Sequence, residues 1–302
     1  MFLQKSNTIE NKLSVQRTFI TGDEWLYYKI YSGPKVADII LTSIIKETCE
    51  QLISQNVIDK WFFIRYTDPK LHLRVRFHLI DRNDISNIIK IMNSSLKFYI
   101  DNDMIWKVQN DTYQREMIRY GSNTIDLAEQ IFFYDSITIV SFLSNINGDT
   151  GEKLRWLFGL KSMDTFLNDF KFNLNEKNEF VTSKKESFAN EFDLNVLMKK
   201  QIGVKYRKES MSVMDVLDNN SNKYFQYNSF LYFKSMAIQP LVYELLKLNE
   251  ENKLEVPLKS LLSSYIHMMI NRLFKTKQRL NEFILYDFLC RYYKSEIMRK
   301  RE

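Results

Sequence analysis

The first hundred residues alternate short β-rich runs with amphipathic stretches. Residues 25–31 are aromatic and apolar and stop at Ser32-Gly33-Pro34, which predicts a strand followed by a turn. Between Lys35 and about Ile53, apolar residues recur every three or four positions, which predicts an amphipathic helix. The other elements predicted in this part are strands at 61–66, 71–80 and 104–108 and a helix at 84–96.

The remainder of the chain has mainly the apolar spacing of helices. Asn123, with Asp126 three residues further on, predicts the N-cap of a helix that runs to about Leu143. From about Glu152 onward the pattern is mostly helical. The second half of the chain is therefore predicted to be built from helices.

Two polar segments interrupt this helical pattern, at 174–187 and 218–223, and both are predicted to be loops. We expect 174–187 to be a flexible loop. The predicted fold class is α+β, with a sheet and flanking helices in the N-terminal half and a largely helical C-terminal half. Because no linker separates the halves, a single domain over 1–302 is expected.

Composition excludes several classes of protein. The 302 residues are 45% hydrophobic and 14% aromatic, enough for a substantial core, and only 7 are Gly and 4 are Pro. Collagen-like, low-complexity and linker-like chains are therefore excluded, and a glycine-built phosphate cradle is not expected. The net charge of +6 is mildly basic, and the Lys-rich stretches are most simply solvated faces.

The two cysteines, Cys49 and Cys290, are far apart in helix-like segments, which suits a reducing cytosol rather than a disulfide framework. No signal peptide and no transmembrane segment are predicted, so the chain is expected to be cytoplasmic. Aromatic residues lie in apolar runs and do not alternate with basic ones, so direct nucleic-acid binding is not expected.

The strand at 71–79 alternates strictly between apolar and basic residues. One face carries leucine, valine and phenylalanine, and the other carries His72, Arg74, Arg76 and His78. A solvent-facing polar side is one interpretation. The other is a cationic floor that holds a carboxylate or a developing oxyanion, which the planar fork of arginine fits. His72 and His78 lie about 20 Å apart along a strand and cannot share a metal ion.

A second basic cluster lies at 113–121. Arg115 and Arg119 are spaced i, i+4 with Glu116 between them. Taken alone, this pattern favours a surface turn with a local ion pair, worth only about 0.3–0.5 kcal/mol.

The segment 261–274 predicts an apolar helix with a narrow polar seam. Ser260, Ser264, His267 and Asn271 are spaced by four, three and four residues and line one face. A satisfied core histidine and a catalytic histidine are both compatible with His267 in such a helix.

Together these segments resemble a known family. The segments that carry the resemblance are 25–34 (WLYYKIYSGP), 61–77 (WFFIRYTDPKLHLRVRF), 113–121 (YQREMIRYG), 132–136 (FFYDS), 266–274 (IHMMINRLF) and 286–295 (YDFLCRYYKS). They are similar to the thiopeptide-type bacteriocin biosynthesis domain, the C-terminal glutamate-elimination part of class I lanthipeptide (nisin-type) dehydratases. The resemblance runs from about Ser14 to Arg299. It implies the stand-alone half of a split dehydratase.

The resemblance implies a function and a set of site residues. In the family, a partner domain uses glutamyl-tRNA to esterify Ser and Thr of a precursor peptide, and this domain expels glutamate to leave dehydroalanine or dehydrobutyrine. The implied catalytic residues are His267, Arg115 and Arg74, with Arg76 as the second choice for the strand arginine. The implied substrate-binding residues are Arg76, Arg119, Arg65, His72 and Asn271.

The chemistry agrees with this assignment. Elimination of a carboxylate needs a base for the Cα proton, which a neutral histidine supplies, and cations for the enolate-like oxygen and the departing glutamate. No metal and no other cofactor is expected. The implied partners are the precursor peptide and a companion tRNA-dependent glutamylating subunit, and a homo-oligomer is compatible with the same sequence.

Two other functions remain open at this point. Related proteins of similar size catalyse a formal [4+2] cycloaddition that forms the pyridine ring of thiopeptides, and the presence of candidates for all three positions favours elimination over it. The other is a non-catalytic subunit that presents the precursor peptide to a companion enzyme.

Overall fold

The structure is a computed structural model that describes residues 15–146, 150–193, 195–218 and 225–300 of the chain. Its sheet-containing half and its helical half confirm the predicted α+β class. The strands are β1 (Thr18–Phe19), β2 (Trp25–Ser32), β3 (Ile58–Thr67), β4 (Leu71–Leu79), β5 (Ile105–Asn110) and β6 (Tyr113–Gln114).

Helices connect and follow these strands. The helices of the N-terminal half are α1 (Pro34–Ile39), the π-helical η1 (Ile40–Ile45), α2 (Lys46–Ser54), the 3-10 turn η2 (Arg82–Asp84) and α3 (Ile85–Asp101). Those that follow are α4 (Met117–Tyr120), α5 (Ile125–Leu143), α6 (Thr150–Asp169), α7 (Leu174–Glu191), α8 (Val196–Leu217), α9 (Phe225–Glu250), α10 (Leu258–Leu273) and α11 (Gln278–Arg299).

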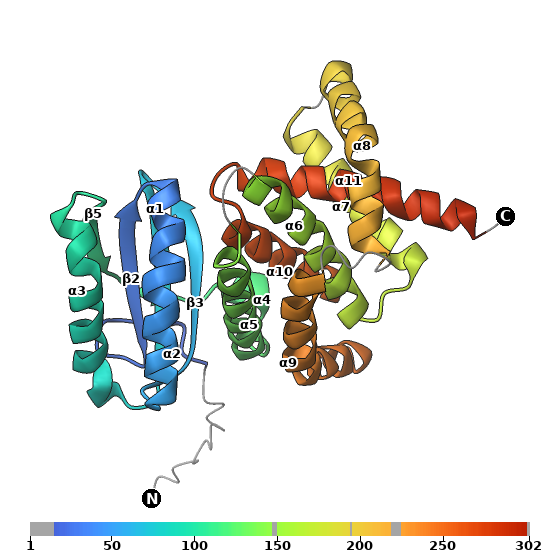
Figure 1. Cartoon of the computed structure of the whole chain (residues 1–302). Helices are drawn as coiled ribbons and strands as arrows, with labels where there is room; N and C mark the ends of the chain where they lie inside the picture. Colours follow the sequence, from blue (N-terminus) through green and yellow to red (C-terminus); the bar gives the residue numbers. More distant parts are fainter. Residues whose placement is uncertain (1–14, 147–149, 194, 219–224, 301–302) are drawn as a thin grey trace, which may run out of the picture.

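The main sheet is antiparallel, with the strand order β3-β4-β2-β5. Helices α1, α2 and α3 cover one of its faces, and the helical half begins beside β3 with α5 (Figure 1). The opposite end of the sheet is β5, which lies away from the helical half (Figure 1). The short strands β1 and β6 form a separate antiparallel pair.

The alternation in β4 separates the two faces of this sheet. Leu73, Val75 and Phe77 are buried in the core. Leu73 pairs with Arg65 of β3, and Arg65 bonds Asp38 of α1, so the apolar side of β4 faces the covering helices. The basic side of β4 therefore lies on the opposite face of the sheet.

The expectation that segment 174–187 is a loop was wrong, because it lies within α7. Asn173 accepts hydrogen bonds from the first turn, and Glu176 bonds back to the backbone of Asn173, so the helix starts with a complete capping box. Phe180 and Phe188 are buried at helical spacing among a polar sequence. Packing of this narrow stripe against α11 stabilises the helix.

The predicted N-cap at Asn123 was also wrong, because Thr124 is the N-cap residue of α5. The amide of Asn123 donates to the carbonyl of Lys253 instead, and the hydroxyl of Thr124 donates to the carbonyl of Tyr120. The predicted loop at 218–223 lies, except for its first residue, outside the described residues. In the part of the chain that is described, no helix has the length and apolar character needed to cross a membrane.

Candidate functional site

A hollow of about 530 Å³ opens on the basic face of the sheet. Tyr27 and Lys29 of β2, paired with Arg76 and Arg74 of β4, form its floor, and residues 111–119 form a wall. Its basic lining residues are Arg17, Lys29, Arg74, Arg76, Arg115 and Arg119, and its acidic ones are Asp111 and Glu116. A concave surface with this excess of positive charge attracts anions.

Arg76 is a buried cation without a counter-ion. Its side chain is 7% exposed and forms no ion pair and no hydrogen bond with the described residues, and its Nε is buried without a partner. Burial lowers the pKa of its guanidinium from the ordinary value. The rings of Tyr27, Tyr113 and Phe62 surround the guanidinium carbon at 4.5, 4.6 and 5.1 Å. An unpaired buried charge is costly, and in the described part of the chain the ring contacts alone offset that of Arg76.

Arg74 is oriented by two neighbours on the same face. Its guanidinium stacks on the ring of Tyr66, 3.4 Å from the ring centroid, and its Nε donates to Nε2 of His72 at 3.1 Å. Nδ1 of His72 lies 2.9 Å from the carbonyl of Lys70, so neutral His72 donates there and accepts from Arg74. Burial lowers the pKa of His72, which favours this neutral form. His72 is thus a support for Arg74 and does not line the hollow.

Arg115 lines the same hollow, but four of its five N–H donors form hydrogen bonds within the protein. It donates to both carboxylate oxygens of buried Glu129, at 2.8 and 2.6 Å, to Asp126 at 2.7 Å and to the carbonyl of Gln16. Burial opposes its charge, but Glu129 outweighs that effect and raises the pKa of Arg115. Its guanidinium therefore fixes the wall of the hollow.

Arg119 lies at the rim of the hollow and is half-exposed. Its Nη1 is 3.3 Å from Glu116, the local ion pair that the sequence predicted. An exposed pair of this kind is weak, so Arg119 is able to exchange partners.

His267 lies outside the hollow and pairs with a carboxylate of the helical half. It lies on α10 with about a quarter of its side chain exposed, and its Nδ1 is 2.7 Å from Oε2 of Glu282 on α11. Glu282 is buried. The carboxylate fixes the ring orientation and leaves Nε2 available. His267 is not among the described residues that line the hollow.

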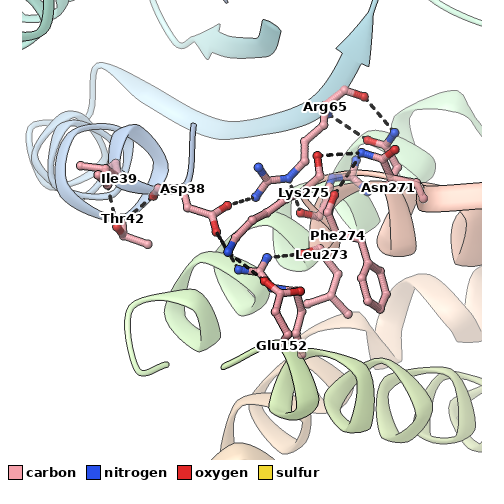
Figure 2. Close-up of polar contacts among 12 residues, drawn as sticks. Asp38, Ile39, Thr42, Arg65, Glu152, Asn271, Leu273, Phe274 and Lys275 are labelled. Carbon is pink, nitrogen blue, oxygen red and sulfur yellow. Dashed lines mark hydrogen bonds and ion pairs between the residues drawn. The ribbon is translucent and has the colours of Figure 1, made fainter. Parts of the chain in front are cut away.

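Arg65 and Asn271, two predicted substrate-binding residues, hold the halves of the molecule together. Asn271 of α10 bonds both the backbone N–H and the carbonyl of Arg65, at 2.9 Å each. The side chain of Arg65 donates to Asp38 at 2.6 Å and to the carbonyl of Arg272 (Figure 2). Asn271 thus joins α10 to the edge strand β3, and the side chain of Arg65 lies on the face that α1 covers.

Asp38 is the centre of this junction. It also accepts from Arg155 of α6 at 2.6 Å, and Lys275 lies 3.7 Å away (Figure 2). Burial works against the carboxylate, but Arg65 and Arg155 outweigh it and hold the pKa of Asp38 below its usual value. A hollow of about 380 Å³ lies beside Asp38 at this seam.

A chain of contacts connects the histidine to the arginines. Asn271 lies one helical turn after His267 and binds Arg65, and the next residue, Tyr66, stacks on Arg74. The structure therefore groups Arg74, Arg76, Arg115 and Arg119 in one hollow and connects His267 to it through neighbouring elements.

Sequence reasoning missed three residues of the site. Tyr27 is in the strand at 25–31, and its position opposite Arg76 follows only from strand pairing. Glu129 and Glu282 carried no distinguishing signal, because each is one acidic residue in a helix. No group of three or more His, Cys, Asp or Glu side chains suited to a metal ion occurs in the described residues.

The structure thus combines, on an α+β fold, an arginine-lined hollow on the sheet with a separate His–Glu pair between α10 and α11. The chain belongs to the family of lantibiotic biosynthesis dehydratase C-terminal domains, whose family model matches residues 25–293. The match includes every residue of the hollow except Arg17.

Two curated relatives are lantibiotic biosynthesis proteins. The chain is 27% identical to the subtilin biosynthesis protein SpaB of Bacillus subtilis over 293 residues, 97% of this chain and 27% of SpaB. It is 32% identical to the nisin biosynthesis protein NisB of Lactococcus lactis subsp. lactis over 193 residues, 60% of this chain and 18% of NisB. The matched part of the chain thus covers about a quarter of SpaB and less than a fifth of NisB.

Solved structures share the fold. The tRNA-dependent lantibiotic dehydratase MibB of Microbispora sp. 107891 matches with a TM-score of 0.74 and 18% identity, over 94% of this chain and 29% of MibB. TbtD, a pyridine synthase from thiomuracin biosynthesis, matches with a TM-score of 0.66 and 10% identity, over 90% of this chain and 99% of TbtD. At these identities the matches establish the fold alone.

Proposed function

We propose that this chain catalyses the β-elimination of glutamate from O-glutamylated Ser or Thr of a ribosomal precursor peptide. The base removes the Cα proton of the esterified residue, the Cα–Cβ double bond forms, and the Cβ–O bond breaks to release glutamate as a carboxylate. The observation that carries the proposal is Arg76, a buried cation that lacks an anionic partner in the described chain and lines a basic hollow. Family membership supplies the reaction class.

The strand arginines are assigned to the anions of this reaction. Arg76 receives a carboxylate of the glutamyl group, because its burial strengthens charge-assisted hydrogen bonds to a ligand. Arg74, held by Tyr66 and His72, stabilises the enolate-like oxygen that develops when the proton leaves. Arg119 at the rim contributes a second, exchangeable contact to the substrate.

Arg115 is assigned a positioning role. Its bonds to Glu129, Asp126 and Gln16 occupy four of its five N–H donors, so we assign it to shaping the wall against which the substrate lies. This assignment differs from the direct catalytic role for Arg115 that the family resemblance implied.

His267 is assigned as the base. The carboxylate of Glu282 at Nδ1 orients the ring and stabilises the imidazolium formed when Nε2 takes the Cα proton. The glutamylated residue must then extend from the hollow toward α10, past Tyr66 and Arg74. Without His267, a loss of about 10²–10⁴-fold in rate is expected.

The partners follow from the reaction. A glutamylated precursor peptide is the substrate, and a companion tRNA-dependent glutamylating protein makes the ester. The proposed pathway is cytoplasmic, because aminoacyl-tRNA is consumed in the preceding step.

Pyridine synthesis by [4+2] cycloaddition is the second candidate. What favours it is the fold match to the pyridine synthase TbtD, which covers nearly the full length of both chains. A cycloaddition releases no glutamate and needs two dehydroamino acids in the substrate, so the two reactions are distinguished by their products.

The test uses a synthetic peptide with one Ser O-glutamyl ester, incubated with the protein alone and followed by mass spectrometry. We expect dehydroalanine and free glutamate with the wild type, and intact ester with His267→Ala. A second peptide with two dehydroalanines tests cyclisation. An ester that stays intact both alone and with the companion glutamylating subunit overturns the elimination proposal.

A further inference from the structure

The two edge strands of the main sheet, β3 and β5, differ in whether other residues bond their outward backbone groups. In β3, Phe63 and Arg65 direct their backbone groups away from β4, and side chains of the helical half bond these groups. Ser136 lies 3.3 Å from the N–H of Phe63 and Arg272 donates to its carbonyl, while Asn271 bonds both backbone groups of Arg65. This edge is covered.

The other edge, β5, is open in the described chain. The N–H of Asp111 donates to the carbonyl of Tyr27, so the hydrogen-bonded pairs of β2 and β5 are those of Gln109 with Lys29 and Lys107 with Tyr31. Val108 and Asn110 then direct their N–H and carbonyl groups away from β2. No described residue bonds these four groups.

The open edge leads directly into the hollow. Asp111 and Thr112, the two residues after β5, line it. Lys107 lies on the face of the sheet that carries the hollow, with its ammonium 5.3 Å from the ring centroid of Tyr31. A strand paired with β5 would lie about 4.8 Å from it and reach the hollow within a few residues, at about 3.3 Å per residue.

We propose that the edge of β5 is a docking strand for the substrate. An extended segment of the precursor peptide, next to the glutamylated residue, pairs its backbone with Val108 and Asn110 and delivers the ester into the arginine hollow. Recognition through the backbone is tolerant of side chains, which suits a substrate with several modified positions. This inference rests on the proposed function, because it names the part of the substrate that binds outside the hollow.

The test measures binding without turnover. The probe is a ten-residue peptide in which 2,3-diaminopropionate, acylated on its side-chain nitrogen with glutamate, replaces the ester, because the amide resists elimination. Amide hydrogen exchange of Val108 and Asn110, followed by NMR, is expected to slow at least about tenfold on saturation. Slow exchange before the peptide is added would show that the edge is already paired, and would overturn the proposal.

Backbone methylation of the probe gives a signature that only strand pairing produces. Methylation of every second amide is expected to raise Kd about fivefold, and methylation of the intervening amides to have little effect. The absence of this two-residue period overturns the proposal.

On the protein side, Val108→Pro removes one outward N–H without removing a bond to β2, and is expected to raise Kd about fivefold. If Val108→Ala weakens binding equally, the side chain and not the amide is responsible, which also overturns the proposal.

Binding with slowed exchange but no elimination from the ester substrate would refute the proposed function alone. Elimination without slowed exchange would refute the docking strand alone.

Discussion

The guanidinium of Arg115 donates two parallel hydrogen bonds to the carboxylate of Glu129, a residue with no exposed surface. The two residues are 14 positions apart, on the wall segment and on α5, and the phenol of Tyr113 donates to the same carboxylate. This pair fixes the wall of the arginine hollow against the helical half.

Arg115→Met is therefore expected to destabilise the protein by about 3–5 kcal/mol, because it leaves the carboxylate of Glu129 buried without a cation. Urea unfolding at pH 7 measures the change. The double variant Arg115→Met/Glu129→Leu is expected to recover most of this loss. A single variant as stable as wild type would show that the pair does not support the wall.

Arg76→Met, unlike Arg115→Met, is expected to reduce activity while leaving stability nearly unchanged. The free energy of unfolding stays within about 1 kcal/mol of wild type, because the lost cation–π contacts are offset by relief from an unpaired buried charge. The kcat/KM for glutamate elimination falls about 10²–10³-fold. Full elimination activity in this variant would remove Arg76 from the site.

Glu282→Gln tests the orientation of His267. The expected result is a decrease in kcat of at least about tenfold with little change in KM, because the imidazolium loses its counter-charge while the substrate contacts remain. Glu282 also pairs with Arg279, whose Nη1 lies 3.6 Å away, and Arg279 forms a second ion pair with Glu191. The matched control is therefore Glu191→Gln, which removes the charge of that second carboxylate. Equal losses in the two variants would indicate that the Arg279 network, and not the bond to His267, is responsible.

Asp38 makes part of the stability depend on pH. Its carboxyl pKa is lowered in the folded state, so the stabilisation is present above the unfolded value of about 3.9 and is lost as pH falls through the folded pKa. Asp38→Asn is expected to lower the free energy of unfolding by about 2–4 kcal/mol at pH 6 and by less at pH 3. Urea unfolding between pH 3 and 6 gives the comparison.

The control for Asp38 is Asp101→Asn, which breaks an exposed pair with Lys97. Its effect is expected to stay within about 0.5 kcal/mol at pH 6. A difference for Asp38→Asn that does not shrink with falling pH would show that the carboxylate charge is not what joins the halves.

The sequence predicted the basic face of β4 well, because alternation in a strand assigns each side chain to a face without knowledge of its neighbours. The polar seam of α10 was predicted for the same local reason, and Asn271 and His267 do lie on one side of that helix. Both patterns depend on backbone geometry alone.

Longer-range features were not predictable in this way. The polar segment 174–187 resembles a loop, but the capping box of Asn173 and Glu176 starts a helix there, and the burial of Phe180 and Phe188 against α11 stabilises it. Asparagine is a common N-cap residue, but the side-chain amide of Asn123 donates to the carbonyl of Lys253, which is 130 residues away in the sequence. In both cases a contact distant in sequence contributes to the outcome, through α11 for α7 and through Lys253 for Asn123.

The sequence by itself therefore determined the fold class and most of the elements outside α7, since these follow from periodicity within single segments. Tertiary structure alone decided which arginine is free. Arg76 and Arg115 look alike in sequence, but Glu129 neutralises one, and aromatic rings that carry no charge surround the other. The physical reason is that the cost of a buried charge depends on its neighbours in space, which the order of residues does not specify.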